Sequence, residues 1–204
     1  MRVTIFDYGA GNLHSLAKAL ESDGALIAVE PDPLRCIETD VLVLPGVGAF
    51  GAAVERLAPG HEAMRHAILE GLPTIGICLG MQLLFDSSDE GGGTGLGVIP
   101  GHVARLQAHR VPQIGWNTIV PGADEPLFLE APLPMAYYAN SFVCRPVDER
   151  SVIAWTTHEA DRFPAAVRAG RTVGVQFHPE KSSTDGVRFL HAFLRESQAY
   201  GATR

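Results

Sequence analysis

Residues 73–85, PTIGICLGMQLLF, change from a short apolar run typical of a strand to a run of helix-forming residues. The same alternation of apolar runs and amphipathic stretches fills the first half of the chain, at residues 2–6, 12–24, 25–30, 40–46 and 52–71. Strands that consist almost entirely of Val, Ile and Leu are buried on both faces of a sheet. The sequence therefore predicts a parallel sheet that is covered by helices on both sides and joined by right-handed crossovers.

The second half has a different pattern, which begins after the glycine-rich segment 90–97. Short alternating runs separated by turn residues predict strands at 103–106, 113–120, 136–144 and 151–157. Residues 165–177 predict a hairpin that turns near Ala169 and Gly170, and residues 185–198 predict a closing helix.

The first predicted helix, 12–24, shows how we expect the helices to pack and end. One apolar stripe faces the sheet and consists of Leu13, Leu16, Ala17 and Leu20. Gly24 supplies the left-handed residue that we expect to stop the helix. Residues 1–204 are therefore expected to form a single α/β domain with three layers: a mostly parallel central sheet, helices on both faces and an added antiparallel segment in the C-terminal half.

Composition excludes several classes of protein. Lys and Arg number 16 against 23 Asp and Glu, with no basic cluster, which argues against a nucleic-acid partner. No apolar run is long enough to span a membrane, and the N-terminus lacks the regions of a secretory signal, so we expect a soluble cytoplasmic protein without a membrane partner. Cys36, Cys78 and Cys144 are odd in number and far apart, which indicates neither a disulfide framework nor a metal site; we expect no cofactor and no metal.

Cys78 lies between Gly76 and Gly80 in a G-x-C-x-G segment, where the predicted strand meets the predicted helix. This is the layout of a nucleophile elbow, in which small neighbours permit a sharp turn that exposes the side chain. The N–H groups at the start of the helix favour thiolate over thiol, and the N–H of Leu79 is placed to bind an oxyanion. The alternative is a buried core cysteine without a chemical role.

A candidate base for Cys78 occurs near the end of the chain, in the segment TVGVQFHPE. His178 and Glu180 are two residues apart, so both side chains can point the same way past Pro179. His178 would take the thiol proton and later protonate the leaving amine, while Glu180 would fix the imidazole tautomer. Taken alone, the same segment is also compatible with a simple turn.

A glycine loop follows the predicted strand 40–46 and places Gly46, Gly48 and Gly51 in the G-x-G-x-x-G spacing of a dinucleotide site. The match is weak, because the loop does not open the fold and Pro45 precedes it. We favour a second use, in which the glycines let backbone amides approach a reacting carbonyl as oxyanion donors opposite Leu79.

Six segments spread over nearly the whole chain resemble those of class I (triad) glutamine amidotransferases, and more narrowly the glutaminase subunits of imidazole glycerol phosphate synthase. They are DYGAGNLHSLAKAL (7–20), LPGVGAFG (44–51), GICLGMQLLF (76–85), GLGVIPG (95–101), VPQIGWN (111–117) and GVQFHPEKS (174–182). CLG with a downstream HPE indicates only the class, because anthranilate, guanylate and carbamoyl phosphate glutaminases share it. GMQLLF, IGWN and HPEKS in this order indicate the subunit.

The resemblance implies a flavodoxin-like fold and hydrolysis of glutamine by Cys78, His178 and Glu180 through a γ-glutamyl thioester. Ammonia would pass through a tunnel to a cyclase subunit with a (β/α)8 barrel, the heterodimer partner, which forms imidazole glycerol phosphate and an aminoimidazole carboxamide ribotide in histidine biosynthesis. The implied roles fall on Val47, Gly48 and Leu79 for the oxyanion, on Gln82, Ser141 and Phe142 for glutamine, and on Asn12 and Lys181 for the cyclase interface.

One segment departs from the family's commonest pattern, because Asn140 stands where a histidine is expected. An amide can hydrogen-bond but cannot titrate, which puts in doubt any interface or gating role of that histidine. Trp116 is expected to be structural or interfacial.

Three other functions stay open: a glutaminase for another acceptor, a γ-glutamyl hydrolase, and a docking subunit without chemistry. A further hypothesis is that the peptide at Gly46, Val47 and Gly48 must reorient before the oxyanion site is complete.

Overall fold

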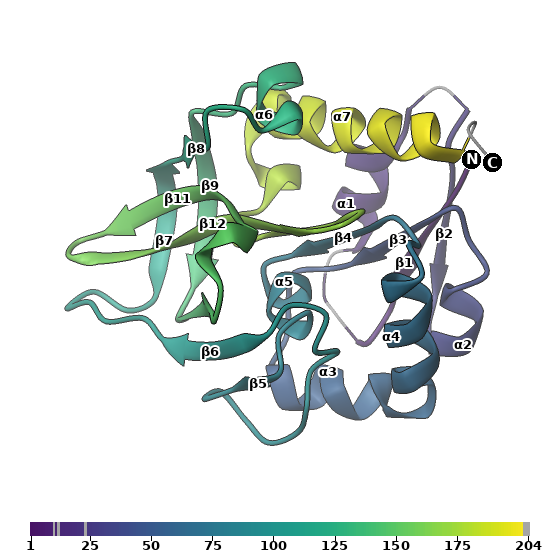
Figure 1. The fold of residues 1–204 in the computed structure, drawn as a ribbon, viewed down its shortest axis with the longest axis horizontal. Coiled ribbons are helices and arrows are strands. Elements are labelled where there is room, and N and C mark those ends of the chain that lie inside the picture. Colours follow the sequence, from purple (N-terminus) through teal and green to yellow (C-terminus); the bar gives the residue numbers. More distant parts are fainter. Residues whose placement is uncertain (10, 12, 23, 202–204) are drawn as a thin grey trace.

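The computed structural model describes residues 1–9, 11, 13–22 and 24–201. Within them, the central sheet has eight strands in the order β2-β1-β3-β4-β13-β12-β11-β8 (Figure 1). Neighbours are parallel from β2 to β13, namely β2 (Leu26–Glu30), β1 (Arg2–Phe6), β3 (Val41–Leu44), β4 (Thr74–Ile77) and β13 (Thr172–Val175). The rest are antiparallel: β12 (Asp161–Ala169), β11 (Val152–His158) and β8 (Val120–Pro121). The predicted mostly parallel sheet with an added antiparallel part is confirmed.

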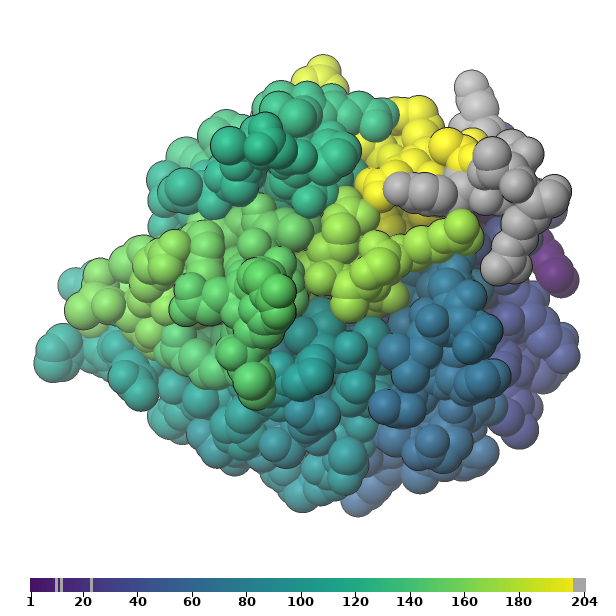
Figure 2. Space-filling model, viewed as in Figure 1, coloured from purple at the N-terminus to yellow at the C-terminus, as the bar shows by residue number. Residues whose placement is uncertain are grey.

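Helices cover both faces of this sheet and complete the three predicted layers. On one face, α1 (Leu13–Leu20), α6 (Pro126–Glu130) and α7 (Ser183–Gly201) share a core with Val3 and Ile5. On the other face, α2 (Pro33–Cys36), α3 (Phe50–Leu57), α4 (His61–Leu69) and α5 (Leu79–Leu83) share a core with Leu42 and Leu44. Successive side chains of a strand point to opposite faces, so strands buried on both faces are apolar throughout. In Figure 2 the antiparallel part, in green, projects from the body formed by the first half, in blue.

Two helix predictions were wrong in extent. α1 ends at Leu20, and Gly24, with a φ of 80°, lies in the turn before β2 instead of ending the helix. The stretch 52–71 is not one helix, because a short 3-10 turn, η1 (Ala58–Gly60), separates α3 from α4. Pro59 explains the break, since proline lacks an N–H and its ring clashes with the carbonyl four residues earlier.

The predicted strand 136–144 is two strands in different sheets. β9 (Met135–Asn140) pairs with β7 (Gln113–Thr118). β10 (Phe142–Pro146) pairs with β6 (Gly101–Arg105), which also pairs with the short β5 (Ser87–Ser88). The chain changes partner at Ser141, and its backbone there faces a pocket that is described below.

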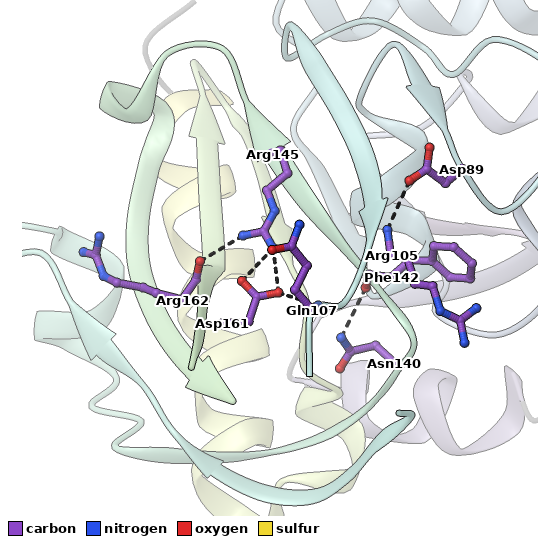
Figure 3. Close-up of polar contacts among 8 residues, drawn as sticks. All are labelled: Asp89, Arg105, Gln107, Asn140, Phe142, Arg145, Asp161 and Arg162. Carbon is purple, nitrogen blue, oxygen red and sulfur yellow. Dashed lines mark hydrogen bonds and ion pairs between the residues drawn. The ribbon is translucent and has the colours of Figure 1, made fainter. Parts of the chain in front are cut away.

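A partly buried ion pair joins the small sheet of β10 to the central sheet (Figure 3). Arg145 on β10 contacts both carboxylate oxygens of Asp161 on β12 at 2.6 Å. The backbone N–H of Gln107 donates to the same carboxylate at 2.8 Å, and Arg145 also donates to the carbonyl of Arg162. Because one carboxylate holds two segments far apart in sequence, it fixes the strand that supplies one wall of the pocket.

The predicted strand 113–120 is also divided, because β7 ends at Thr118 and pairs with β9, whereas Val120 begins β8, which pairs with β11 in the central sheet. The other predictions for the C-terminal half agree with the structure. The β12–β13 hairpin turns at Gly170 and Arg171, next to the predicted position, and Gly170 has a φ of 58°. Two further 3-10 turns are described, η2 (Glu149–Ser151) and η3 (Pro179–Lys181), and residues 176–178 connect β13 to η3, which precedes α7. No described helix is long and apolar enough to cross a membrane.

Candidate active site

Cys78 occupies the predicted turn between β4 and α5. Its backbone has a φ of 49° and a ψ of −103°, a conformation that non-glycine residues rarely adopt. A side chain on Gly76 would lie 2.5 Å from the carbonyl oxygen of Gly80, and one on Gly80 would collide with the carbonyl oxygen of Leu44. The N–H of Cys78 donates to the carbonyl of Val175 at 2.7 Å. The two glycines therefore permit the close backbone approach that turns the thiol outward, as the sequence predicts.

His178 lies beside this thiol, at the end of the strand that neighbours β4. Its Nδ1 is 2.8 Å from the Glu180 carboxylate, and its side chain is almost completely buried. Burial lowers the pKa of His178, but hydrogen bonds to Cys78 and Glu180 and the negative charge of both outweigh this effect and raise the pKa to about 10. The three predicted triad residues thus lie together, and the Glu180 carboxylate and the charge of Cys78 favour an imidazolium.

Ser182 fixes the backbone of His178. Its hydroxyl donates to the His178 carbonyl at 2.6 Å and accepts from the N–H of Tyr137 at 2.9 Å. The N–H of His178 in turn donates to the Tyr137 carbonyl at 2.8 Å. Both backbone polar groups of His178 are therefore linked to β9: its N–H directly, and its carbonyl through the Ser182 hydroxyl.

A pocket of about 230 Å³ opens in front of the sulfur. Its lining contains every site residue predicted from the sequence except Glu180, which lies behind His178, and Asn12, which is outside the described residues. These lining residues are Val47, Gly48, Cys78, Leu79, Gln82, Ser141, Phe142, His178 and Lys181. A larger hollow of about 480 Å³ near Thr39, Glu70 and Arg171 has no nucleophile with a base among its described lining residues, and it lies at the amino-terminal ends of the strands.

The glycine loop forms one wall of this pocket and is held at both ends. The Tyr8 hydroxyl donates to the carbonyl of Pro45 just before the loop. The N–H of Phe50 just after it donates to the Glu90 carboxylate at 3.0 Å. Between these contacts Gly48 has a φ of 131°, which favours glycine. The loop therefore lies opposite Leu79, as predicted, with a backbone conformation that only glycine adopts without strain.

Tyr8 is itself almost fully buried, and its hydroxyl stays protonated. Burial and then the negative charge of Cys78 raise the pKa of Tyr8 well above its ordinary value. The hydroxyl can therefore act as a permanent donor to the loop across the neutral pH range.

Sequence reasoning missed two polar side chains of the site. Glu90, in the glycine-rich segment, lines the pocket and presents a carboxylate to it. Gln176 is fully buried, and its Nε2 lies 3.5 Å from the Cys78 sulfur. Neither belongs to a local pattern that indicates chemistry; only the position of Gln176 in the segment before His178 could have drawn attention to it.

Two amide side chains support the wall opposite the sulfur. Gln82 Nε2 and Asn140 Nδ2 each donate to the carbonyl of Phe142 at 3.2 Å, and Figure 3 shows the second of these bonds. The backbone turn at Ser141 is thereby fixed where it lines the pocket. Asn140 thus has a structural contact that accounts for an amide at this position.

An apolar face continues from the pocket along β7 and β9. Residues directly opposite each other in the antiparallel pair point to one side, and on the outer side they are Ile114 with Ala139, Trp116 with Tyr137 and Thr118 with Met135. Ile114 is 67% exposed and Trp116 is 52% exposed, and the Trp116 ring packs edge-on against Tyr137. Since Ala139 also lines the pocket, the exposed apolar face and the candidate active site share a border.

Comparisons with known proteins agree with this site. Residues 4–196 match the family model described as glutamine amidotransferase class-I. The imidazole glycerol phosphate synthase subunit HisH of Symbiobacterium thermophilum is 45% identical over 93% of this chain and 91% of its own. The protein of the same name from Microcystis aeruginosa is 40% identical over 96% of each chain. A solved structure described as a glutamine amidotransferase superimposes with a TM-score of 0.73 over 96% of this chain and 98% of that chain; at 20% identity this likeness concerns the fold.

Proposed function

The chain belongs to the class-I glutamine amidotransferase family, and we propose that it hydrolyses glutamine as the ammonia-producing subunit of imidazole glycerol phosphate synthase. The chemistry rests on the hydrogen bond between His178 and Glu180 and on the position of His178 and Cys78 in one pocket at the carboxyl ends of the strands. The assignment to imidazole glycerol phosphate synthase rests on sequence identities of 40% and 45% to two relatives of that name over nearly their whole lengths.

In the first half of the reaction, the Cys78 thiolate attacks the carbonyl carbon of the glutamine side-chain amide. The C–N bond breaks, the imidazolium of His178 gives its proton to the departing nitrogen, and ammonia leaves behind a γ-glutamyl thioester. The raised pKa of His178, about 10, keeps this proton in place at neutral pH until it is needed.

In the second half, the now neutral His178 takes a proton from water, and the resulting hydroxide attacks the thioester. The C–S bond breaks, its electron pair returns to sulfur, and glutamate is released with the thiolate and imidazolium restored. Glu180 holds the imidazole through Nδ1 in both steps, which leaves Nε2 for the exchange of protons.

Backbone N–H groups bind the negative charge that develops on the oxygen of this carbonyl group in both steps. We assign this role to Leu79 at the start of α5 and to the Val47–Gly48 segment of the glycine loop, which face each other across the pocket. Loss of one such donor costs about 10²–10³ in rate, so a loop peptide that turns away would keep the enzyme nearly inactive.

The other end of glutamine carries an ammonium and a carboxylate. The Glu90 carboxylate, which already lines the pocket, is the charge that would pair with the ammonium. Gln82 and the backbone at Ser141 and Phe142 supply the remaining polar groups. This arrangement leaves the γ-amide as the part of the substrate that reaches the sulfur.

The partner is a cyclase subunit with a (β/α)8 barrel, which docks over the mouth of the pocket and receives ammonia from it. The apolar face formed by Ile114, Trp116, Met135 and Tyr137 supports this placement, because it is exposed and borders the pocket at Ala139. Lys181 lies at the same mouth and supplies a positive charge at the rim. A biosynthetic role of this kind supports the cytoplasmic location that we propose.

The test compares native protein with Cys78→Ala, each mixed with the cyclase subunit. The expected result is that Cys78→Ala abolishes imidazole glycerol phosphate formation from glutamine but retains formation from added ammonia. Retention of glutamine-dependent turnover would refute the triad. Glutamine hydrolysis without any stimulation by the cyclase would point to a glutaminase for another acceptor.

A further inference from the structure

Gln176 presents a side-chain amide to the nucleophilic sulfur from inside the protein, and we propose that this amide is a catalytic hydrogen-bond donor that favours the thiolate of Cys78. Gln176 directly follows β13, and its Nε2 lies 3.5 Å from Sγ. The side chain is fully buried and is not among the residues that line the pocket, so this contact lies inside the protein. The inference rests on the proposed function, in which that sulfur is the nucleophile.

Packing alone does not account for an amide at this position. The flanking residues Val175 and Phe177 are fully buried apolar residues, and an apolar side chain would fill the same space. The amide oxygen, Oε1, has no hydrogen-bond partner among the described residues. A buried polar atom without a partner costs about 1–3 kcal/mol. The contact that offsets this cost in the part of the chain that the structure describes is the one to the sulfur.

The two neutral groups that contact the sulfur have opposite effects on the equilibrium between thiol and thiolate. The Ala139 carbonyl, 3.9 Å from Sγ, can accept a hydrogen bond only while the thiol keeps its proton. The Gln176 N–H can donate to either form and binds the anion more strongly, because hydrogen bonds to charged acceptors are stronger than those to neutral ones. The amide therefore shifts the equilibrium toward the thiolate without adding a charge to the core.

The same donor acts at two points of the reaction. Before the attack it raises the fraction of Cys78 present as thiolate. When the thioester is hydrolysed, the C–S bond breaks and its electron pair returns to the sulfur, and the amide hydrogen-bonds this leaving thiolate. No proton moves to or from Gln176 in either step, and His178 keeps its role as the acid and base.

The test measures the rate at which iodoacetamide alkylates Cys78 in the full-length chain as a function of pH. Cys78→Ala supplies the background from Cys36 and Cys144, both fully buried. In Gln176→Met, which keeps the volume but removes the donor, we expect the midpoint of the profile to rise by about one pH unit and kcat for glutamine to fall about tenfold with the cyclase present, since one pKa unit corresponds to a factor of ten. Gln176→Glu, which has the same shape, should shift the midpoint further because its carboxylate repels the thiolate.

Thr74→Val is the matched control. Thr74 is also fully buried, and its hydroxyl donates to the Leu72 carbonyl at the opposite end of β4, so the variant loses a buried hydrogen bond far from the sulfur. Its alkylation midpoint should equal that of the native chain. Native midpoints in both Gln176 variants, or an equal shift in Thr74→Val, would overturn the inference. Failure of the native chain to release glutamate would refute the proposed function instead, and the alkylation profiles would still decide whether the amide acts on the sulfur.

Discussion

The hydroxyl of Tyr8 donates a hydrogen bond to the carbonyl of Pro45, across the first and third strands of the chain. Pro45 is followed by Gly46, whose added side chain would approach the His178 ring within 3.0 Å. One phenol therefore holds the entrance of the glycine loop against His178, the proposed acid and base. The functional consequence is that the position of the proposed oxyanion donors depends on a residue that does not line the pocket.

Tyr8→Phe should lower kcat about tenfold with little change in KM, because the loop loses its anchor while the residues assigned to glutamine binding are untouched. Leaving the buried Pro45 carbonyl without a partner should also cost about 1–3 kcal/mol of unfolding free energy. Ser197→Ala, which removes a buried hydroxyl donor to the Phe193 carbonyl on α7, should cost a similar amount of stability but leave kcat unchanged. Equal kcat losses in the two variants would contradict the anchor role. Steady-state kinetics and urea unfolding check both.

Glu90→Gln should raise KM for glutamine by about tenfold to a hundredfold, since a charge-assisted hydrogen bond is worth about 1.5–3 kcal/mol. The amide can still accept from the N–H of Phe50, so the loop should keep its place and kcat should change less. Glu90→Ala removes both contacts and should reduce kcat as well. Initial rates over a range of glutamine concentrations separate the two effects; an unchanged KM in Glu90→Gln would mean that the ammonium binds elsewhere.

The alkaline limit of activity should depend on Glu180. The pKa of His178 is raised to about 10, so kcat should fall as the pH rises through that value and the imidazolium loses its proton. Glu180→Gln removes one of the groups that raise this pKa, and the fall should move about 1–3 units toward lower pH. Glu130→Gln, which changes an exposed carboxylate paired with Arg195, is the control and should leave the limit in place. A kcat–pH profile for the three proteins decides the matter.

Trp116→Ala should weaken binding of the cyclase subunit about thirtyfold or more, because an exposed aromatic residue at the centre of an interface contributes about 2 kcal/mol or more. Leu26→Ala is the matched control, since Leu26 is 69% exposed on β2 at the other edge of the central sheet. Isothermal titration of the two subunits measures both. Equal affinities for the two variants would place the partner on another surface.

Gly80→Ala should destabilise the fold by about 3 kcal/mol, because the added methyl group collides with the Leu44 backbone and the overpacked elbow must shift. Gly92→Ala meets no heavy atom within 4 Å and should be nearly neutral. Urea unfolding of both variants tests the comparison, and a neutral Gly80→Ala would show that the elbow tolerates expansion.

The central sheet and its layers could be predicted because strands buried on both faces leave long apolar runs, as in β3 and β4. The change of partner at Ser141 could not, because β9 and β10 form a continuous strand-like pattern and only their neighbours in space separate them. Short elements such as α2 and α6 were missed for a similar reason, since they contain too few residues for a period to appear.

The proposed triad residues could be selected from the sequence because each part has a local pattern, and the parallel pairing of β4 with β13 brings both parts to one edge of the sheet. Gln176, Glu90 and Tyr8 could not be assigned from sequence, because each acts through one contact with a segment distant in the chain. A buried amide or phenol has the same appearance in a sequence whether it supports the core or the chemistry.

The backbone at Cys78, with a φ of 49°, is in a region where a glycine would be relaxed and any side chain is strained. Cys78→Gly should therefore unfold at a higher urea concentration than the native chain. Selection for stability alone would therefore replace the cysteine with glycine. The thiol is retained at this strained position because catalysis requires it.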